Sequence, residues 1–144
     1  MTEKGLFVLW EKAMPYQDAI LSDIESHFHI DEVFEVNWGN NFSDIVLDFY
    51  RHDIPPGEDK AAKCGIGTFA VVVVTDLNPV YKVRKTLRAE KNVEANFFDA
   101  KKRYRKIVSE TDPYCIAVHG TNNKEEFEHD YSFLIKYKGG GNHD

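Results

Sequence analysis

The chain has 144 residues, of which 42% are hydrophobic and 13% aromatic, and this composition excludes an intrinsically disordered protein. The net charge of -6 argues against bulk nucleic-acid binding, and no apolar run approaches the roughly 20 residues needed to span a bilayer. The first residues lack a signal-peptide pattern, so we expect a cytoplasmic protein, without membrane contact, whose Cys64 and Cys115 are reduced. The length fits one domain, predicted at residues 1–138, followed by a flexible tail at 139–144.

The first half of the chain predicts two strands and two helices. Residues 5–11 are apolar and β-prone, which indicates a strand. Pro15 suits the first turn of a helix, and apolar residues at helical spacing extend that helix to about residue 28. The alternating residues 30–38 predict a half-exposed strand, and residues 42–50 predict a short amphipathic helix. A loop rich in proline and glycine is predicted to follow, at residues 52–67.

The second half contains the strongest strand signal of the chain. The valine run within residues 67–75 predicts a strand that is buried on both faces, at the centre of a sheet. Asn78-Pro79 predicts the start of a helix that carries Arg84 and Arg88 on one face. Residues 95–107 fit either a helix or a long loop. A short strand is predicted at residues 114–118, and Asn122 with Glu125 forms a capping box for the last helix.

The order of these elements indicates the fold class. Strands that alternate with helices around one doubly buried strand predict an α/β sandwich, an α+β fold with a sheet of about four strands. Two successive βαβ units fit the split βαβ, or ferredoxin-like, arrangement with helices packed on the sheet.

Positive charge is concentrated between Lys82 and Lys106. This segment holds ten basic and three acidic residues, a net charge of +7, which leaves -13 for the rest of the chain. Such a segment is typical of a site for a compact polyanion, such as a nucleoside triphosphate, or of a solvated basic helix face. A further interpretation of this basic segment is a docking surface for an acidic protein partner.

The most informative functional motif is the string from Val118 to Asn122. It places His119 at the exit of an apolar segment and at the mouth of a helix. Neutral imidazole is a nucleophile toward phosphorus, and a helix N-terminus attracts anions. The motif therefore predicts phosphoryl chemistry at His119, and the alternative is a structural histidine beside a helix cap.

Several segments together resemble the nucleoside diphosphate kinases. The string His119-Gly120-Thr121-Asn122 looks like the family's phosphohistidine motif, and Asp130 falls where the family has a glutamate that orients the histidine. Residues 7–12 look like the first strand of the family, which ends in a lysine that contacts phosphate. Residues 67–71 are similar to its valine-rich strand, and residues 83–87 resemble a helix whose arginine binds nucleotide phosphate.

This resemblance implies a ping-pong mechanism in which His119 accepts a γ-phosphate while Asp130 holds its ring. It also implies Mg²⁺ with ATP or another nucleoside triphosphate, no metal ligands from the protein itself, and a homo-oligomer. The nucleotide and phosphate ligands expected on this basis are Lys12, Tyr50, Arg84, Arg88, Arg103, Arg105 and Asn122.

The chain also departs from the family pattern near Lys12. The family's lysine precedes Pro-Asp-Gly, whereas Lys12 precedes Ala13-Met14-Pro15. Two alternatives therefore stand beside the phosphotransferase. One is a catalytically altered module that binds a nucleotide or nucleotide-sugar. The other is a protein-interaction domain that uses the basic segment 82–106.

Overall fold

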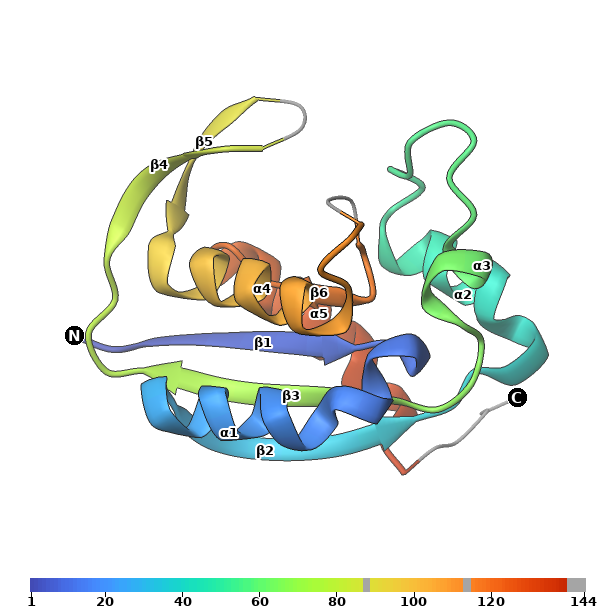
Figure 1. The fold of residues 1–144 in the computed structure, drawn as a ribbon, viewed down its shortest axis with the longest axis horizontal. Coiled ribbons are helices and arrows are strands. Elements are labelled where there is room, and N and C mark those ends of the chain that lie inside the picture. The colour runs from blue at the N-terminus through green and yellow to red at the C-terminus, as the bar shows by residue number, and fades with distance from the viewer. Residues whose placement is uncertain (87–88, 113–114, 140–144) are drawn as a thin grey trace.

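The computed structural model describes residues 1–86, 89–112 and 115–139 (Figure 1). Over these residues the chain forms a four-stranded antiparallel sheet in the order β2-β3-β1-β6 and a separate two-stranded hairpin of β4 and β5. The predicted α+β sandwich is confirmed. The predicted tail at 139–144 falls, beyond Gly139, outside the described residues. No helix in the described ranges is long and apolar enough to cross a bilayer.

The topology of the large sheet is that of a split βαβ fold. Its strands are β1 (Glu3–Leu9), β2 (His29–Val36), β3 (Phe69–Asp76) and β6 (Val118–Gly120). β3 pairs antiparallel with both β1 and β2, and β1 pairs antiparallel with β3 and β6. Each βαβ unit therefore has a strand of the other unit between its own two strands, which is the predicted ferredoxin-like arrangement.

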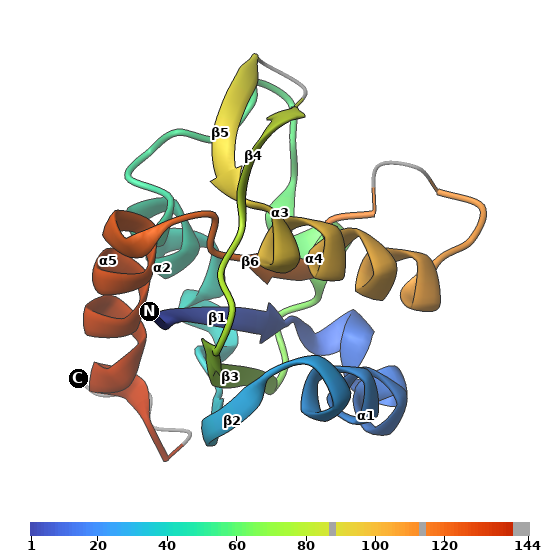
Figure 2. The same ribbon diagram turned by 90° about the vertical axis from the view of Figure 1, so that its left-hand side faces the viewer.

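Two long helices cover one face of this sheet. α1 (Gln17–His27) and α4 (Ala95–Val108) lie side by side on it (Figure 2). Their apolar residues meet the alternate residues of β1 and β3, with Phe7 in edge-to-face contact with Tyr104 at 5.3 Å between ring centroids. Of the two alternatives for residues 95–107, the helix is confirmed, because its buried stripe completes this core.

The opposite face is covered by α2 (Phe42–Phe49), α3 (Lys60–Cys64) and α5 (Lys124–Leu134). Its centre is an aromatic cluster in which the Trp10 ring lies 4.8 Å and the Trp38 ring 4.9 Å from the Phe69 ring. Short 3₁₀ turns at 11–16, 39–41 and 135–137 connect these elements. Both cysteines are buried free thiols, as predicted.

The helix predicted after Pro79 is wrong. β4 (Tyr81–Lys85) pairs with β5 (Glu90–Glu94) as an antiparallel hairpin that projects from the body of the molecule (Figure 1). Val80, Tyr81 and Val83 are β-prone residues, and this preference outweighs the helical spacing of the apolar positions. Arg84 therefore lies on a strand, and Arg88 lies outside the described residues.

Other parts of the sequence prediction also differ from the structure: β1, β2 and β3 are each shifted by one or two residues, and Pro15 lies in the 3₁₀ turn that precedes α1. The last strand is Val118–Gly120, and residues 115–117 before it are not in a strand. The N-cap of α5 is Asn123, whose side chain accepts from the Glu126 backbone amide, so the cap lies one residue later than predicted. The predicted loop at 52–67 contains α3, which begins where the Asp59 side chain accepts from the Ala62 amide.

A buried acidic pair lies at the base of the hairpin. Glu94 is fully buried, and its Oε1 accepts from the amides of Asn96 and Val80. Asp76 is also buried, and it accepts from the side chain of Asn96. Burial, together with a hydrogen bond to Asp76, raises the pKa of Glu94 to about 8. Glu94 is therefore protonated at neutral pH and donates this hydrogen bond.

We expect Glu94→Gln to remove a pH dependence of stability. The folded pKa of Glu94 lies above the unfolded value of about 4.3, so its stabilising contribution, complete below pH 4.3, is lost as pH rises toward 8. The amide of Gln keeps both hydrogen-bonding roles at every pH. Between pH 5 and 8.5 the variant should gain roughly 4 kcal/mol of unfolding free energy relative to wild type, measured by urea denaturation. Parallel pH profiles for the two proteins contradict this account.

Candidate functional site

His119 lies on the edge strand β6, opposite Val8 of β1. Because side chains alternate along a strand, Val118 enters the core beneath α1 and α4, whereas His119 projects toward α2 and α5. There the His119 Nε2 lies 2.7 Å from Oδ2 of Asp130, a buried residue of α5. The structure thus brings together the two residues that the sequence proposed as the catalytic pair.

The Asp130 contact determines the tautomer of His119. An ionised carboxylate only accepts hydrogen bonds, so the Nε2 of His119 carries the proton and Nδ1 carries the lone pair. The hydroxyl of Tyr50, at the end of α2, lies 3.4 Å from that Nδ1. Burial raises the pKa of Tyr50, so it stays protonated and donates a long hydrogen bond to Nδ1.

Aromatic rings form the walls around the imidazole. The ring centroids of Phe49 and Tyr50 lie 5.3 and 5.5 Å from that of His119, both nearly perpendicular to it. Phe49 is buried, so its ring belongs to the core of this face of the sheet. The imidazole is partly enclosed, with 18% of its side chain exposed.

Three cations lie next to residues that flank His119, namely Val118, Gly120 and Tyr50. Arg105 on α4 donates from Nε to the carbonyl of Val118 at 2.8 Å, and burial lowers its pKa. Lys101, one turn earlier, packs against Gly120, and burial with the nearby Arg105 lowers its pKa to about 7. The Nζ of Lys60 lies 4.4 Å from the ring centroid of Tyr50. These groups supply positive charge on both sides of the strand that carries His119.

The sequence did not single out Lys60 and Lys101. The four-residue spacing of Lys101 and Arg105 was the available signal, because it places both on one side of a helix. Lys60 gave no such signal, since it reaches Tyr50 only through the packing of α3 on α2.

Other predicted phosphate ligands lie away from His119. Arg84 makes two hydrogen bonds, of 3.0 and 3.1 Å, to Asp99, near the start of α4. Arg103 pairs with Asp23 of α1, on the other face of the sheet.

Lys12 and Asn122 contact neighbouring segments. Lys12 donates to the carbonyl of Ala62 in α3. The backbone N–H of Asn122 donates to the side chain of Glu126. The buried side-chain Oδ1 of Asn122 has no hydrogen-bond partner among the described residues.

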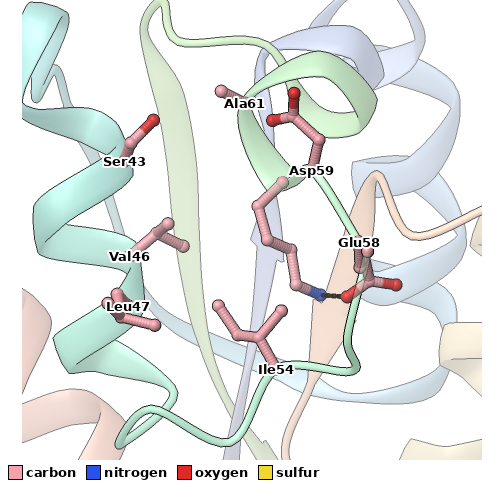
Figure 3. A pocket seen from close by; sticks show the side chains of 9 residues that line it. Ser43, Val46, Leu47, Ile54, Glu58, Asp59 and Ala61 are labelled. Carbon is pink, nitrogen blue, oxygen red and sulfur yellow. Dashed lines mark ion pairs between the residues drawn. The ribbon is translucent and has the colours of Figure 1, made fainter.

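Two cavities flank the site. One of about 500 Å³ lies between the 3₁₀ turn 11–16, α3, the end of α4 and residues 115–117, which lead into His119. Lys12 and Lys63 contribute its positive charge, and Asp112 contributes a carboxyl group. The other, of about 540 Å³, lies between α2 and α3, where the Lys60–Glu58 ion pair of 3.0 Å crosses it (Figure 3). His119 lines neither cavity.

Comparison with solved structures finds nucleoside diphosphate kinases. The Aquifex aeolicus enzyme superposes with a TM-score of 0.60 at 15% identity, covering 93% of this chain and 95% of that chain. The Encephalitozoon cuniculi enzyme superposes with a TM-score of 0.55 at 14% identity, covering 99% of this chain and 96% of that chain. The Halobacterium salinarum enzyme, in complex with CDP, gives 0.53 at 12% identity over 100% and 95%.

These likenesses establish the fold. No protein-family model and no curated protein matches the sequence. The chain nevertheless has the ferredoxin-like fold of the nucleoside diphosphate kinases over nearly its whole length, as the resemblance predicted.

Proposed function

We propose that this chain is a nucleotide-dependent phosphotransferase that carries a γ-phosphate on His119. The observation that carries the proposal is the 2.7 Å contact between the His119 Nε2 and Asp130, because it leaves Nδ1 as the nucleophilic nitrogen. The fold, shared with nucleoside diphosphate kinases, supports the same reaction class.

The proposed reaction has two half-reactions. The Nδ1 lone pair attacks the γ-phosphorus, the bond from phosphorus to the bridging oxygen breaks, and the nucleoside diphosphate leaves with that electron pair. The proton on Nε2 stays in the hydrogen bond to Asp130, whose negative charge stabilises the positive imidazole ring. A terminal oxygen of a second nucleoside diphosphate then attacks the phosphorus, and Nδ1 recovers its lone pair.

Arg105, Lys101 and Lys60 are proposed to stabilise the phosphate charge that builds up beside His119. The nucleotide is proposed to occupy the cavity lined by Lys12 and Lys63, next to the segment that leads into β6. Arg84 and Arg103 can join it only by leaving their carboxylate partners.

Mg²⁺ is expected to enter with the triphosphate. Of the nearby carboxylates, Asp130 already accepts from histidine and Glu58 pairs with Lys60. No cluster of three or more potential metal ligands occurs in the part of the chain that the structure describes. The donor set therefore fits a cation held by phosphate oxygens and water, where it neutralises phosphate charge.

Labelling with γ-labelled ATP and Mg²⁺ tests the proposal. Wild type should acquire label that is labile in acid and stable in alkali, as expected for a phosphoramidate, and His119→Ala should acquire none. His52→Ala is the matched control, because His52 is exposed and its ring nitrogen bonds Asp48 of α2. An unlabelled wild type, or equal labelling of wild type and His119→Ala, contradicts the proposal.

A nucleotide-binding module without phosphate transfer is the second candidate. The observation that favours it is the Tyr50 hydroxyl beside Nδ1, where an incoming phosphorus would have to approach. Such a module should bind nucleoside triphosphate in calorimetry, and Lys12→Met should lower that affinity. It should acquire no label from γ-labelled ATP.

A further inference from the structure

The Asp130 carboxylate bonds two histidines. Its Oδ2 lies 2.7 Å from the Nε2 of His119, and its Oδ1 lies 2.8 Å from the Nδ1 of His129, the preceding residue of α5. Both imidazoles must supply a proton to these contacts, because an ionised carboxylate only accepts. One buried carboxylate is thus held at both oxygens.

The second hydrogen bond addresses a weakness of aspartate as an orienting group. The torsion that sets the plane of an Asp carboxylate has a broad, roughly two-fold energy profile, so one hydrogen bond leaves that plane poorly fixed. A donor on Oδ1 fixes the plane and keeps Oδ2 directed at His119. Charge-assisted hydrogen bonds of this length are among the stronger ones in proteins.

The ring of His129 is itself held in place. It lies 6.2 Å from the rings of both Phe49 and Phe133, tilted 30° and 32° against them. Phe49 also contacts the His119 ring, so the two imidazoles share one aromatic wall. The orientation of His129 is therefore set by packing as well as by its hydrogen bond.

We propose that His129 is a positioning residue: its Nδ1–H fixes the Asp130 carboxylate, which in turn fixes the tautomer and ring orientation of His119. It acts through Asp130, since its contact is to that carboxylate. The consequence for phosphate transfer rests on the proposed function, whereas the consequence for the His119 ring does not.

Two substitutions separate the hydrogen bond from the packing. His129→Asn keeps a donor on the atom bonded to Cγ, the place of Nδ1, while His129→Phe keeps an aromatic ring against Phe49 and Phe133 and removes the donor. His129→Met replaces the Phe variant should that variant not fold. His27→Phe is the control, because His27 is a histidine at the end of α1 whose ring contacts Asp23, on the other face of the sheet.

The primary readout is the ¹⁵N spectrum of the His119 ring without any phosphate donor. Wild type, His129→Asn and His27→Phe should show one protonated nitrogen and one bare nitrogen, whereas the donor-free variant should show averaged shifts. Unchanged His119 shifts in the donor-free variant overturn the proposal, and so does a His129→Asn spectrum that matches the donor-free one. Failure of wild type to take up phosphate leaves this readout intact and contradicts only the proposed function.

The second readout is the rate of phosphate labelling from ATP. The donor-free variant should be labelled about tenfold to a hundredfold more slowly, by analogy with the loss of the outer partners of metal-bound histidines, and His129→Asn should recover most of that rate. Equal rates for wild type and the donor-free variant, with wild type labelled, overturn the catalytic part of the proposal.

Discussion

Replacing Asp130 by Asn is expected to slow phosphorylation of His119 by up to roughly 10⁴-fold, the loss seen when the carboxylate behind a catalytic histidine is replaced by an amide. The amide cannot compensate the positive charge of the phosphorylated ring, and its NH₂ group favours the tautomer with the proton on Nδ1. Label uptake from ATP under single-turnover conditions measures the rate. The affinity for nucleotide should change little, because Asp130 bonds His119 and His129 and does not line the proposed nucleotide cavity.

Asp99→Asn is the matched control for this substitution. Asp99 pairs with Arg84 at the surface of α4, with 44% of its side chain exposed, so its loss should leave the labelling rate close to wild type. A wild-type rate in Asp130→Asn contradicts the assigned role of Asp130.

Replacing Arg105 by Met should reduce the labelling rate by roughly 10²- to 10³-fold, the usual cost of removing one preorganised donor from a site of developing negative charge. Arg105 is bonded to the carbonyl that precedes His119, so its position relative to the imidazole is fixed by the strand. Its pKa is lowered by burial, which means that an anion nearby would relieve a desolvated charge.

Arg84→Met is the variant with which the labelling rate of Arg105→Met is compared. The family resemblance assigns phosphate binding to Arg84, whereas the structure pairs Arg84 with Asp99 on a hairpin strand. The same assay should therefore show a large loss in Arg105→Met and a rate within about twofold of wild type in Arg84→Met, because exposed ion pairs contribute little. A larger loss in Arg84→Met than in Arg105→Met contradicts the arrangement of cations described above.

Most of the sheet could be predicted from the sequence because its strands carry strong local signals. The valine run of β3 is buried along its length, and the amphipathic spacing of α2 matches its buried face. The hairpin was not predicted, because Val80, Val83 and Leu87 are spaced as in a helix. The β preference of Val80, Tyr81 and Val83, together with the pairing of β4 with β5, outweighs that spacing.

The candidate site was only partly predictable for a related reason. His119 and Asp130 are held by neighbouring elements near the C-terminus, and the resemblance placed both. The contact of Lys60 with Tyr50 depends on tertiary packing of α3, and that of His129 with Asp130 depends on side-chain orientation, so sequence patterns reveal neither. Among the basic residues of 82–106, sequence alone could not separate Arg105, which bonds the Val118 carbonyl, from Arg84 and Arg103, which pair with carboxylates.

The central claim is that the Nδ1 of His119 accepts phosphate. Phosphorus-coupled ¹H–¹⁵N spectroscopy of the protein, purified after incubation with ATP and Mg²⁺, identifies the ring nitrogen bonded to phosphorus. We predict coupling to Nδ1 of His119 and a retained proton on Nε2. Phosphorus on Nε2, on a different residue, or on no residue at all contradicts the account.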